Sequence, residues 1–157
     1  MIRKDRLRDA AFAWNALEHA PYAVLAMADQ EGKPYCIPVT PGADRAHGVI
    51  YLHCAKAGQK LDMMRANPSV CLTAVSEAQS VPTEFEMTFA SAVFTGHAEE
   101  VTDRAEKVEG LRIICQRYDP DGMYRFEEVV NRLVDGTCVI KIVVEEATGK
   151  EAPAKKG

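Results

Sequence analysis

The chain has 157 residues, of which 47% are hydrophobic and 27% are charged, and its formal net charge is -4 at pH 7. This length predicts one domain over residues 1–157 with a real hydrophobic core, and the composition excludes a disordered or fibrous protein. Lysine and arginine are scattered rather than clustered, so no footprint for nucleic acid is expected.

The cysteines and histidines show no pattern of a metal site. Five cysteines form no C-x-x-C pair, and four histidines have no zinc-ligand spacing. An odd number of cysteines, each inside a segment typical of strand or helix, predicts buried thiols in a reducing compartment. The N-terminus is too charged for a signal peptide, and no apolar run approaches the roughly 20 residues that span a bilayer. We therefore expect a cytoplasmic protein with no membrane association.

The N-terminal third of the chain predicts a helix followed by a β-hairpin. Apolar residues at three- and four-residue spacings predict an amphipathic helix over 5–19, within an N-terminal helical segment 1–20 that covers one end of a barrel. Residues 22–29 and 34–40 predict the two strands of the hairpin. Pro38 cannot donate a ladder hydrogen bond, so the second strand is expected at an edge or a bulge.

A strand over 48–56 leads directly into a glycine and a short helix. Gly58 allows a close backbone approach, and the helix carries Lys60 in its first turn and ends at Asn67. The free N–H groups and the positive dipole end of a helix start attract anions, and Lys60 adds a full charge. Spacing alone favours the alternative, in which Gly58 only turns the chain and Lys60 is a solvated surface lysine.

The middle of the chain predicts two further strands, over 69–76 and 87–101. The polar segment 77–86 between them is predicted to be a loop, and its length makes it a candidate lid or dimer contact. Gly96 lies inside the second of these strands and indicates a bulge or a close backbone approach.

The C-terminal part predicts two helices and a last strand. Thr102 is the expected N-cap of a helix over 103–118, a second helix follows over 123–134, and a strand is expected over 137–145. Residues 151–157 are expected to form a flexible tail. The succession of strands with short turns predicts a mainly β fold with flanking helices (α+β), in which about six strands form a barrel.

Two polar residues on the predicted strands could reach a ligand. His53 precedes the glycine junction, where a neutral imidazole could bind a ligand or transfer a proton. Ser91 could offer its hydroxyl to a phosphate. The alternatives are a structural strand histidine and a small serine that packs closely. No G-x-S-x-G elbow or local cysteine signature is present, so hydrolase chemistry is not predicted.

Taken together, these segments resemble the nitroimidazole-resistance (Nim-type) branch of the pyridoxamine 5'-phosphate oxidase-like flavin split barrels. The resemblance rests on P-Y-x-x-P-V over 34–39, I-Y-L-H-C-A-x-x-G-x-K within the block 50–71, V-P-x-x-F over 81–85, F-x-S-x-V-x-x-G-x-A over 89–98 and T-G-K-E-A over 148–152. It implies an FMN-binding split β-barrel that forms a homodimer, with FMN at each of two interfacial sites.

The resemblance also implies which residues hold FMN. Lys60 would pair with the phosphate, and Ser91 would lie close enough to assist. His53 corresponds to the active-site histidine of the family. The cofactor-binding residues that the resemblance implies are Pro38, Val39, Thr40, His53, Cys54, Ala55, Gly58, Lys60 and Ser91. The chain departs from its relatives at Ala90, where they often carry arginine, and at Gln59, where they often carry histidine.

The function that the resemblance implies is an FMN-dependent oxidoreductase, with His53 as the catalytic residue. Electrons would pass from NAD(P)H through the flavin to a small electrophile such as a nitroaromatic or a quinone. The chain lacks a C-terminal Arg-x-His stretch, so vitamin B6 synthesis is not predicted. The alternatives are a non-catalytic flavin-binding or sensory protein, a split barrel that uses haem or deazaflavin, and a ligand-free structural module.

Overall fold

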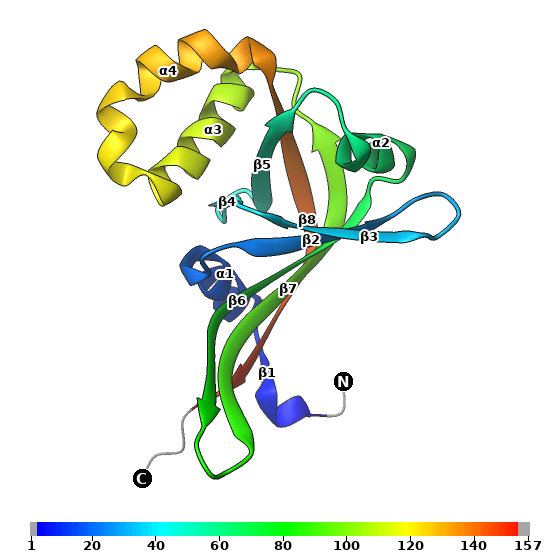
Figure 1. Cartoon of the computed structure of the whole chain (residues 1–157), viewed down its shortest axis with the longest axis vertical. Helices are drawn as coiled ribbons and strands as arrows, with labels where there is room; N and C mark the ends of the chain where they lie inside the picture. Colours follow the sequence, from blue (N-terminus) through cyan, green and yellow to red (C-terminus); the bar gives the residue numbers. More distant parts are fainter. Residues whose placement is uncertain (1–2, 154–157) are drawn as a thin grey trace.

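An eight-stranded antiparallel sheet organises residues 3–153, the part of the chain that the computed structural model describes. The strand order is β3-β2-β6-β7-β8-β5-β4, with β1 paired to β8, so the sheet is open between β3 and β4 (Figure 1). The strands are β1 (Leu7–Arg8), β2 (Ala23–Ala28), β3 (Pro34–Val39), β4 (Gly42–Asp44), β5 (Val49–Ala55), β6 (Ser69–Val81), β7 (Glu86–Glu100) and β8 (Thr137–Ala152). The predicted mainly β fold with flanking helices is confirmed.

The expected number of about six strands was too low, because β1 and β4 were missed. These strands have two and three residues, so neither is long enough to show an alternating pattern. The helices are α1 (Ala10–His19), α2 (Gln59–Ala66), α3 (Arg104–Tyr118) and α4 (Phe126–Leu133), with 3-10 helices at Lys4–Arg6, Pro120–Arg125 and Val134–Gly136. Within residues 3–153, no helix has the length and apolar character needed to cross a membrane.

The N-terminal helix begins later than the sequence predicted. The Asp9 side chain accepts a hydrogen bond from the backbone N–H of Phe12 at 2.9 Å and caps α1. Leu7 and Arg8 instead form β1, and Leu7 pairs with Lys150 of β8. The helix ends at His19, before Pro21, as predicted. The prediction over 5–19 was therefore wrong for residues 5–9, where the Asp9 cap marks the helix start.

The predicted loop over 77–86 is confirmed only for the turn at 82–85 and is wrong for the residues on either side of it. Strand β6 continues to Val81, β7 begins at Glu86, and these two residues are in register. The two strands form a long hairpin that extends away from α3 and α4 (Figure 1). Most of 77–86 is exposed on both faces of the hairpin, so the sequence carries no alternation that would mark a half-buried strand.

Helices α3 and α4 form an arm at one end of the sheet (Figure 1). The N-cap of α3 is Asp103 rather than the predicted Thr102, because the Asp103 side chain accepts a hydrogen bond from Glu106 N–H at 2.8 Å. The helix predicted over 123–134 is 3-10 up to Arg125 and α-helical only from Phe126. Phe126, Val130 and Val134 form a separate apolar cluster that packs against residues of α3.

The last strand is longer than predicted and includes part of the expected tail. Strand β8 runs from Thr137 to Ala152 rather than ending at 145. Glu151 accepts a hydrogen bond from Arg8 Nε at 2.8 Å, and Ala152 is in register with Phe89 of β7. The flexible tail was therefore wrongly predicted at residues 151 and 152, whereas residues 154–157 lie outside the described part of the chain.

The cysteines differ in exposure, so the expectation of five buried thiols was too simple. Cys138 is buried, three others are partly buried, and Cys36 is exposed. Cys36 lies on β3, an end strand of the sheet, as the proline at position 38 predicted for this strand. Tyr35, Ile37 and Val39 of β3 pack against the core, so Cys36 points to the opposite face of the strand and its thiol lies in solvent.

Gly96 lies at an irregularity between β7 and β8, in agreement with the predicted bulge. A Cβ atom added there would lie 2.1 Å from the carbonyl oxygen of Val143. We expect Gly96→Ala to lower the free energy of unfolding by roughly 1–3 kcal/mol, because the backbone must move to relieve the overlap. Urea unfolding measures this change.

Gly136→Ala provides the matched control, because an added Cβ at Gly136 meets nothing within 4 Å. An equal loss of stability in the two variants would contradict the role of close packing at Gly96.

Candidate functional site

A cleft of about 250 Å³ lies where the end of β3, the end of β5 and the start of α2 meet. Its lining residues are Tyr22, Pro38, Val39, Thr40, Leu52, His53 and Lys60. Five of the residues predicted from the sequence as cofactor-binding are therefore brought together: Pro38, Val39, Thr40, His53 and Lys60. These come from two separate parts of the chain, since β3 and β5 lie at different places in the sheet order.

The local sequence explains why the cleft has an apolar wall and a polar end. Strand β5 buries Ile50, Tyr51 and Leu52, and His53 is its first exposed residue. The chain then turns from the end of β5 into α2 (Figure 1), which places Lys60 beside the strand end. On the other side, Pro38 has no N–H to offer to a neighbouring strand. The cleft therefore joins an apolar surface to a basic, hydrogen-bonding end.

Gly58 shapes the basic end of the cleft. Its φ of +138° is a conformation that residues with a side chain rarely adopt, and no atom lies within 4 Å of where a Cβ would be. Its carbonyl oxygen accepts hydrogen bonds from the N–H groups of Leu61 and Asp62, at 2.9 and 3.2 Å. No side chain caps the start of α2. A helix start without a side-chain cap keeps N–H groups for an anion such as phosphate.

Lys60 and His53 give this end its electrostatic character. Within residues 3–153, the Lys60 ammonium forms no ion pair with a carboxylate. His53 keeps part of its surface in solvent, but the protein atoms around its ring remove some of its hydration, and this desolvation, together with the nearby Lys60 charge, lowers the pKa of His53 below 6.5. His53 is therefore neutral at pH 7, so one ring nitrogen can donate and the other can accept a hydrogen bond.

Two lining residues, Tyr22 and Leu52, were not predicted as site residues. Tyr22 is 53% exposed even though it lies directly before the buried Ala23 of β2. A half-exposed tyrosine beside a strand carries no distinctive local pattern, so Tyr22 could not be predicted as a site residue. Leu52 precedes His53, and its buried place in β5 marks it as a core residue, although it also reaches the cleft.

The structure does not place every predicted residue at the cleft. Cys54, Ala55 and Gly58 belong to the same strand-to-helix junction but do not line it. Ser91 is distant: it pairs with Lys150 of β8, whereas His53 pairs with Val139, eleven residues earlier in that strand. At about 3.3 Å per residue this separation is roughly 35 Å. Ser91 and Lys60 of one chain therefore cannot contact the same phosphate.

A larger groove, of about 550 Å³, lies between the N-terminal residues and the β6–β7 hairpin. Its lining includes three arginines and four carboxylates: Arg3, Arg6, Arg8, Asp5, Glu84, Glu86 and Glu151. Arg3 pairs with Asp5 at 2.7 Å and Arg8 with Glu151 at 2.8 Å. The mixture of charges gives this groove no preference for an anion, so the smaller cleft is the better candidate.

The electrostatics of His53 lead to a pH prediction. We expect the His53 ring to titrate below pH 6.5 in the unliganded protein, and Lys60→Ala to move this midpoint upward, because one cause of the depression is removed. A depressed pKa in the folded state means that the unfolded chain binds the proton more readily. The His53 contribution to stability is therefore complete above pH 6.5 and is lost as the pH falls through the folded-state pKa.

Nuclear magnetic resonance of the histidine ring protons measures this titration. Lys56→Ala is the control, because Lys56 is exposed and is not one of the causes that lower the pKa of His53. A His53 midpoint at or above 6.5 would show that the ring is not held in the environment described.

Comparison with known proteins gives a family and a fold. A family model described as pyridoxamine 5'-phosphate oxidase matches residues 9–151. No curated protein matches the chain. Among solved structures, a candidate 5-nitroimidazole antibiotic resistance protein from Bacteroides thetaiotaomicron is 25% identical, with a TM-score of 0.73 and coverage of 92% of this chain and 88% of that one.

Two further structures share the fold at lower identity. The flavocytochrome Anf3 from Azotobacter vinelandii is 23% identical, with a TM-score of 0.78 and coverage of 94% of this chain and 70% of that one. A FAD-binding protein from Mesorhizobium loti is 22% identical, with a TM-score of 0.64 and coverage of 94% and 98%. These likenesses agree with the open sheet described above and identify the fold as a split barrel.

Proposed function

The chain belongs to the pyridoxamine 5'-phosphate oxidase family, and we propose on that basis that it is an FMN-binding oxidoreductase with its flavin in the cleft. Electrons would come from NAD(P)H and pass to a small electrophile such as a nitroaromatic or a quinone. One observation carries the proposal: at one end of an apolar cleft, Lys60 lies at the start of α2, which has no side-chain cap, and its ammonium pairs with no carboxylate in the part of the chain that the structure describes.

The basic end of the cleft fits the phosphate of FMN. The N–H groups at the start of α2, the positive end of its dipole and the Lys60 ammonium all favour a dianion. The open space at Gly58 lets a phosphate approach the backbone without meeting a side chain. FMN ends in a phosphate, whereas riboflavin does not, so this end also favours the phosphorylated flavin.

The remaining walls fit a flat aromatic ring system. Pro38, Val39 and Leu52 offer apolar surface, and Thr40 and the backbone around it offer hydrogen-bonding groups. Tyr22 lies at the rim with about half of its surface exposed, which leaves its ring available to stack on a ligand. Bound flavin would supply the electron transfer between the nicotinamide and the acceptor.

The size of the cleft supports a second copy as part of the site. Its 250 Å³ is below the roughly 300–1,000 Å³ of most ligand pockets. In a homodimer the second copy would add a wall and bring Ser91 of the partner subunit to the flavin, since Ser91 of the same chain is too far away. Val75 and Val93, which are exposed on the outer face of β6 and β7, provide apolar surface near Ser91 for such a contact.

His53 would act at the cleft as a neutral imidazole. Because its pKa is lowered, it carries a proton on one ring nitrogen and can donate a hydrogen bond to an acceptor molecule beside the flavin, which would stabilise negative charge on that molecule as it is reduced. The chain would thus orient the cofactor and the acceptor, the flavin would carry the electrons, and solvent would supply the proton.

Steady-state oxidation of NAD(P)H by the FMN-loaded protein tests this function, with a nitroaromatic or a quinone as acceptor. The proposal predicts oxidation that depends on both the acceptor and the protein. Saturable FMN binding without turnover would favour the non-catalytic flavin-binding alternative. A Soret band in the spectrum of the purified protein would instead indicate haem and contradict the FMN assignment.

A further inference from the structure

Two cysteines that the proposed function does not use lie next to each other on adjacent strands of the sheet. Cys54 of β5 and Cys138 of β8 are direct partners in the antiparallel ladder. Direct partners have Cα atoms about 4.5–5.5 Å apart and carry their side chains on the same face of the sheet. Disulfides need Cα atoms about 4.4–6.8 Å apart. The backbone therefore already holds this pair at a distance that a disulfide can bridge.

The two thiols differ in their surroundings. Cys138 is 5% exposed, whereas Cys54 is only partly buried. Burial, and then the neighbouring Cys54 and Glu100, together raise the pKa of the Cys138 thiol to about 11. Cys138 is therefore protonated at neutral pH. The more accessible Cys54 is the thiol that a small oxidant meets first.

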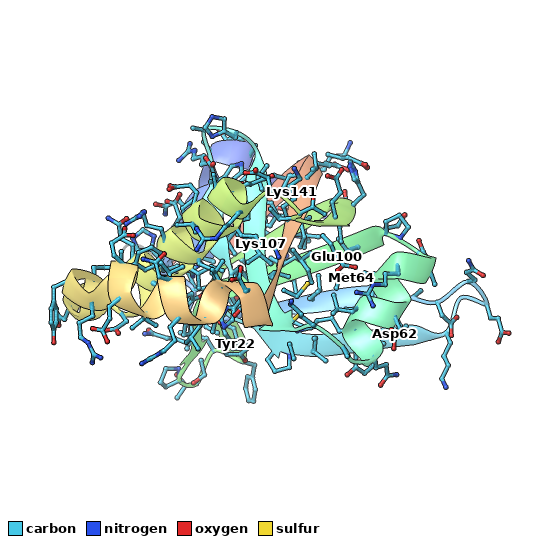
Figure 2. The ribbon with its side chains drawn as sticks, turned by 90° about the horizontal axis from the view of Figure 1, so that it is seen from above. Tyr22, Asp62, Met64, Glu100, Lys107 and Lys141 are labelled. Carbon is cyan, nitrogen blue, oxygen red and sulfur yellow. The ribbon has the colours of Figure 1, made fainter. Side chains whose placement is uncertain are left out.

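Glu100 of β7 accepts a hydrogen bond from the Cys138 thiol and favours its protonated form. The Cys138 thiol donates to Glu100 Oε2 with a sulfur–oxygen distance of 3.7 Å. Arg65 of α2 donates to both oxygens of Glu100, at 2.6 and 3.0 Å, and these bonds lower the pKa of Glu100. Met64 and Glu100 lie side by side (Figure 2) and line a cavity of about 100 Å³, which is large enough for a few water molecules.

We propose that Cys54 and Cys138 form a reversible disulfide bond when the protein meets hydrogen peroxide. Cys54 loses its proton to solvent, and its thiolate attacks one peroxide oxygen, so an S–O bond forms, the O–O bond breaks, and hydroxide leaves. The Cys138 thiol then attacks the Cys54 sulfur. The S–S bond forms, the S–O bond breaks, and the departing hydroxide takes the Cys138 proton and leaves as water.

The balance is two thiols and one hydrogen peroxide giving one disulfide and two water molecules. The two sulfurs together lose two electrons, and the peroxide gains them. A thiol reductant reverses the reaction by thiol–disulfide exchange. The bond would join β5 to β8 one residue beyond His53, and its formation does not require a bound flavin.

Peptide mapping of the full chain after peroxide treatment tests the proposal. Cleavage after lysine and arginine places the five cysteines in five different peptides, with Cys54 in residues 46–56 and Cys138 in residues 133–141. We expect these two peptides to be cross-linked in the unmutated protein and released by dithiothreitol. Exposed Cys36 serves as the internal control for oxidation, and Cys36→Ser is expected to leave the cross-link unchanged.

One variant separates the steps. Cys138→Ser is expected to leave a sulfenic acid on Cys54 that dimedone traps. Free thiols at Cys54 and Cys138 after Cys36 has been oxidised, or pairing of either with another cysteine, would overturn the disulfide.

Discussion

Replacing Lys60 with alanine is expected to weaken FMN binding about tenfold to a hundredfold. Lys60 lines the polar end of the cleft, and no carboxylate in residues 3–153 neutralises its ammonium. A hydrogen bond to a charged group contributes about 1.5–3 kcal/mol, and each 1.4 kcal/mol changes the dissociation constant tenfold. Quenching of flavin fluorescence during titration measures the loss.

Two controls make the Lys60 prediction specific. Lys56→Ala removes an exposed lysine of the same charge four residues earlier, which does not line the cleft, and should leave the affinity nearly unchanged. Lys60→Arg keeps the charge and should retain most of the binding. If Lys60→Ala and the unmutated protein bound FMN with equal affinity, the flavin phosphate would not be bound by Lys60 at the start of α2.

Phe94→Ala is expected to lower the free energy of unfolding by about 3–5 kcal/mol, the largest stability change that we predict. Phe94 of β7 is 1% exposed, and its ring centroid lies 4.9 Å from that of Trp14 in α1, with the planes tilted by 60°. Removing the ring loses its buried surface and leaves a cavity between the helix and the sheet. Urea unfolding followed by Trp14 fluorescence gives the change, because Trp14 is the one tryptophan in the chain.

Phe85→Ala is the matched control for this stability prediction. Phe85 lies in the turn of the β6–β7 hairpin with its side chain fully exposed. The same truncation should change the free energy of unfolding by no more than about 0.5 kcal/mol. A cost for Phe94→Ala that is as small as the cost for Phe85→Ala would mean that α1 is not packed on β7 as described.

The sequence predicted the elements that carry a strong local pattern. Three features could be predicted from residues that are adjacent in the sequence. They are the hairpin of β2 and β3, the edge position of Pro38, and the succession of strand, Gly58 and helix. These signals are local, because a turn, a missing N–H group or a helix start depends on a few adjacent residues. The five predicted residues that meet at the cleft all lie in such segments.

The errors arose where structure depends on distant residues or on exposure. The polar residues of 77–86 extend a hairpin beyond the core, where no alternation is needed to keep strands paired. Strand β1 forms because Leu7 pairs with Lys150, which lies near the other end of the sequence. The distance between Ser91 and Lys60 depends on the long register of β7 on β8, which no local pattern reveals. Tyr22 was missed for the same reason, since only the fold brings it to His53.

The most direct test of the proposed function is a parallel titration of the unmutated protein with FMN and with riboflavin. The proposal rests on a phosphate held by Lys60 and the start of α2, so FMN should bind saturably and riboflavin about tenfold or more weakly. No saturable binding of FMN, or equal affinity for the two flavins, would contradict the placement of a flavin phosphate in this cleft.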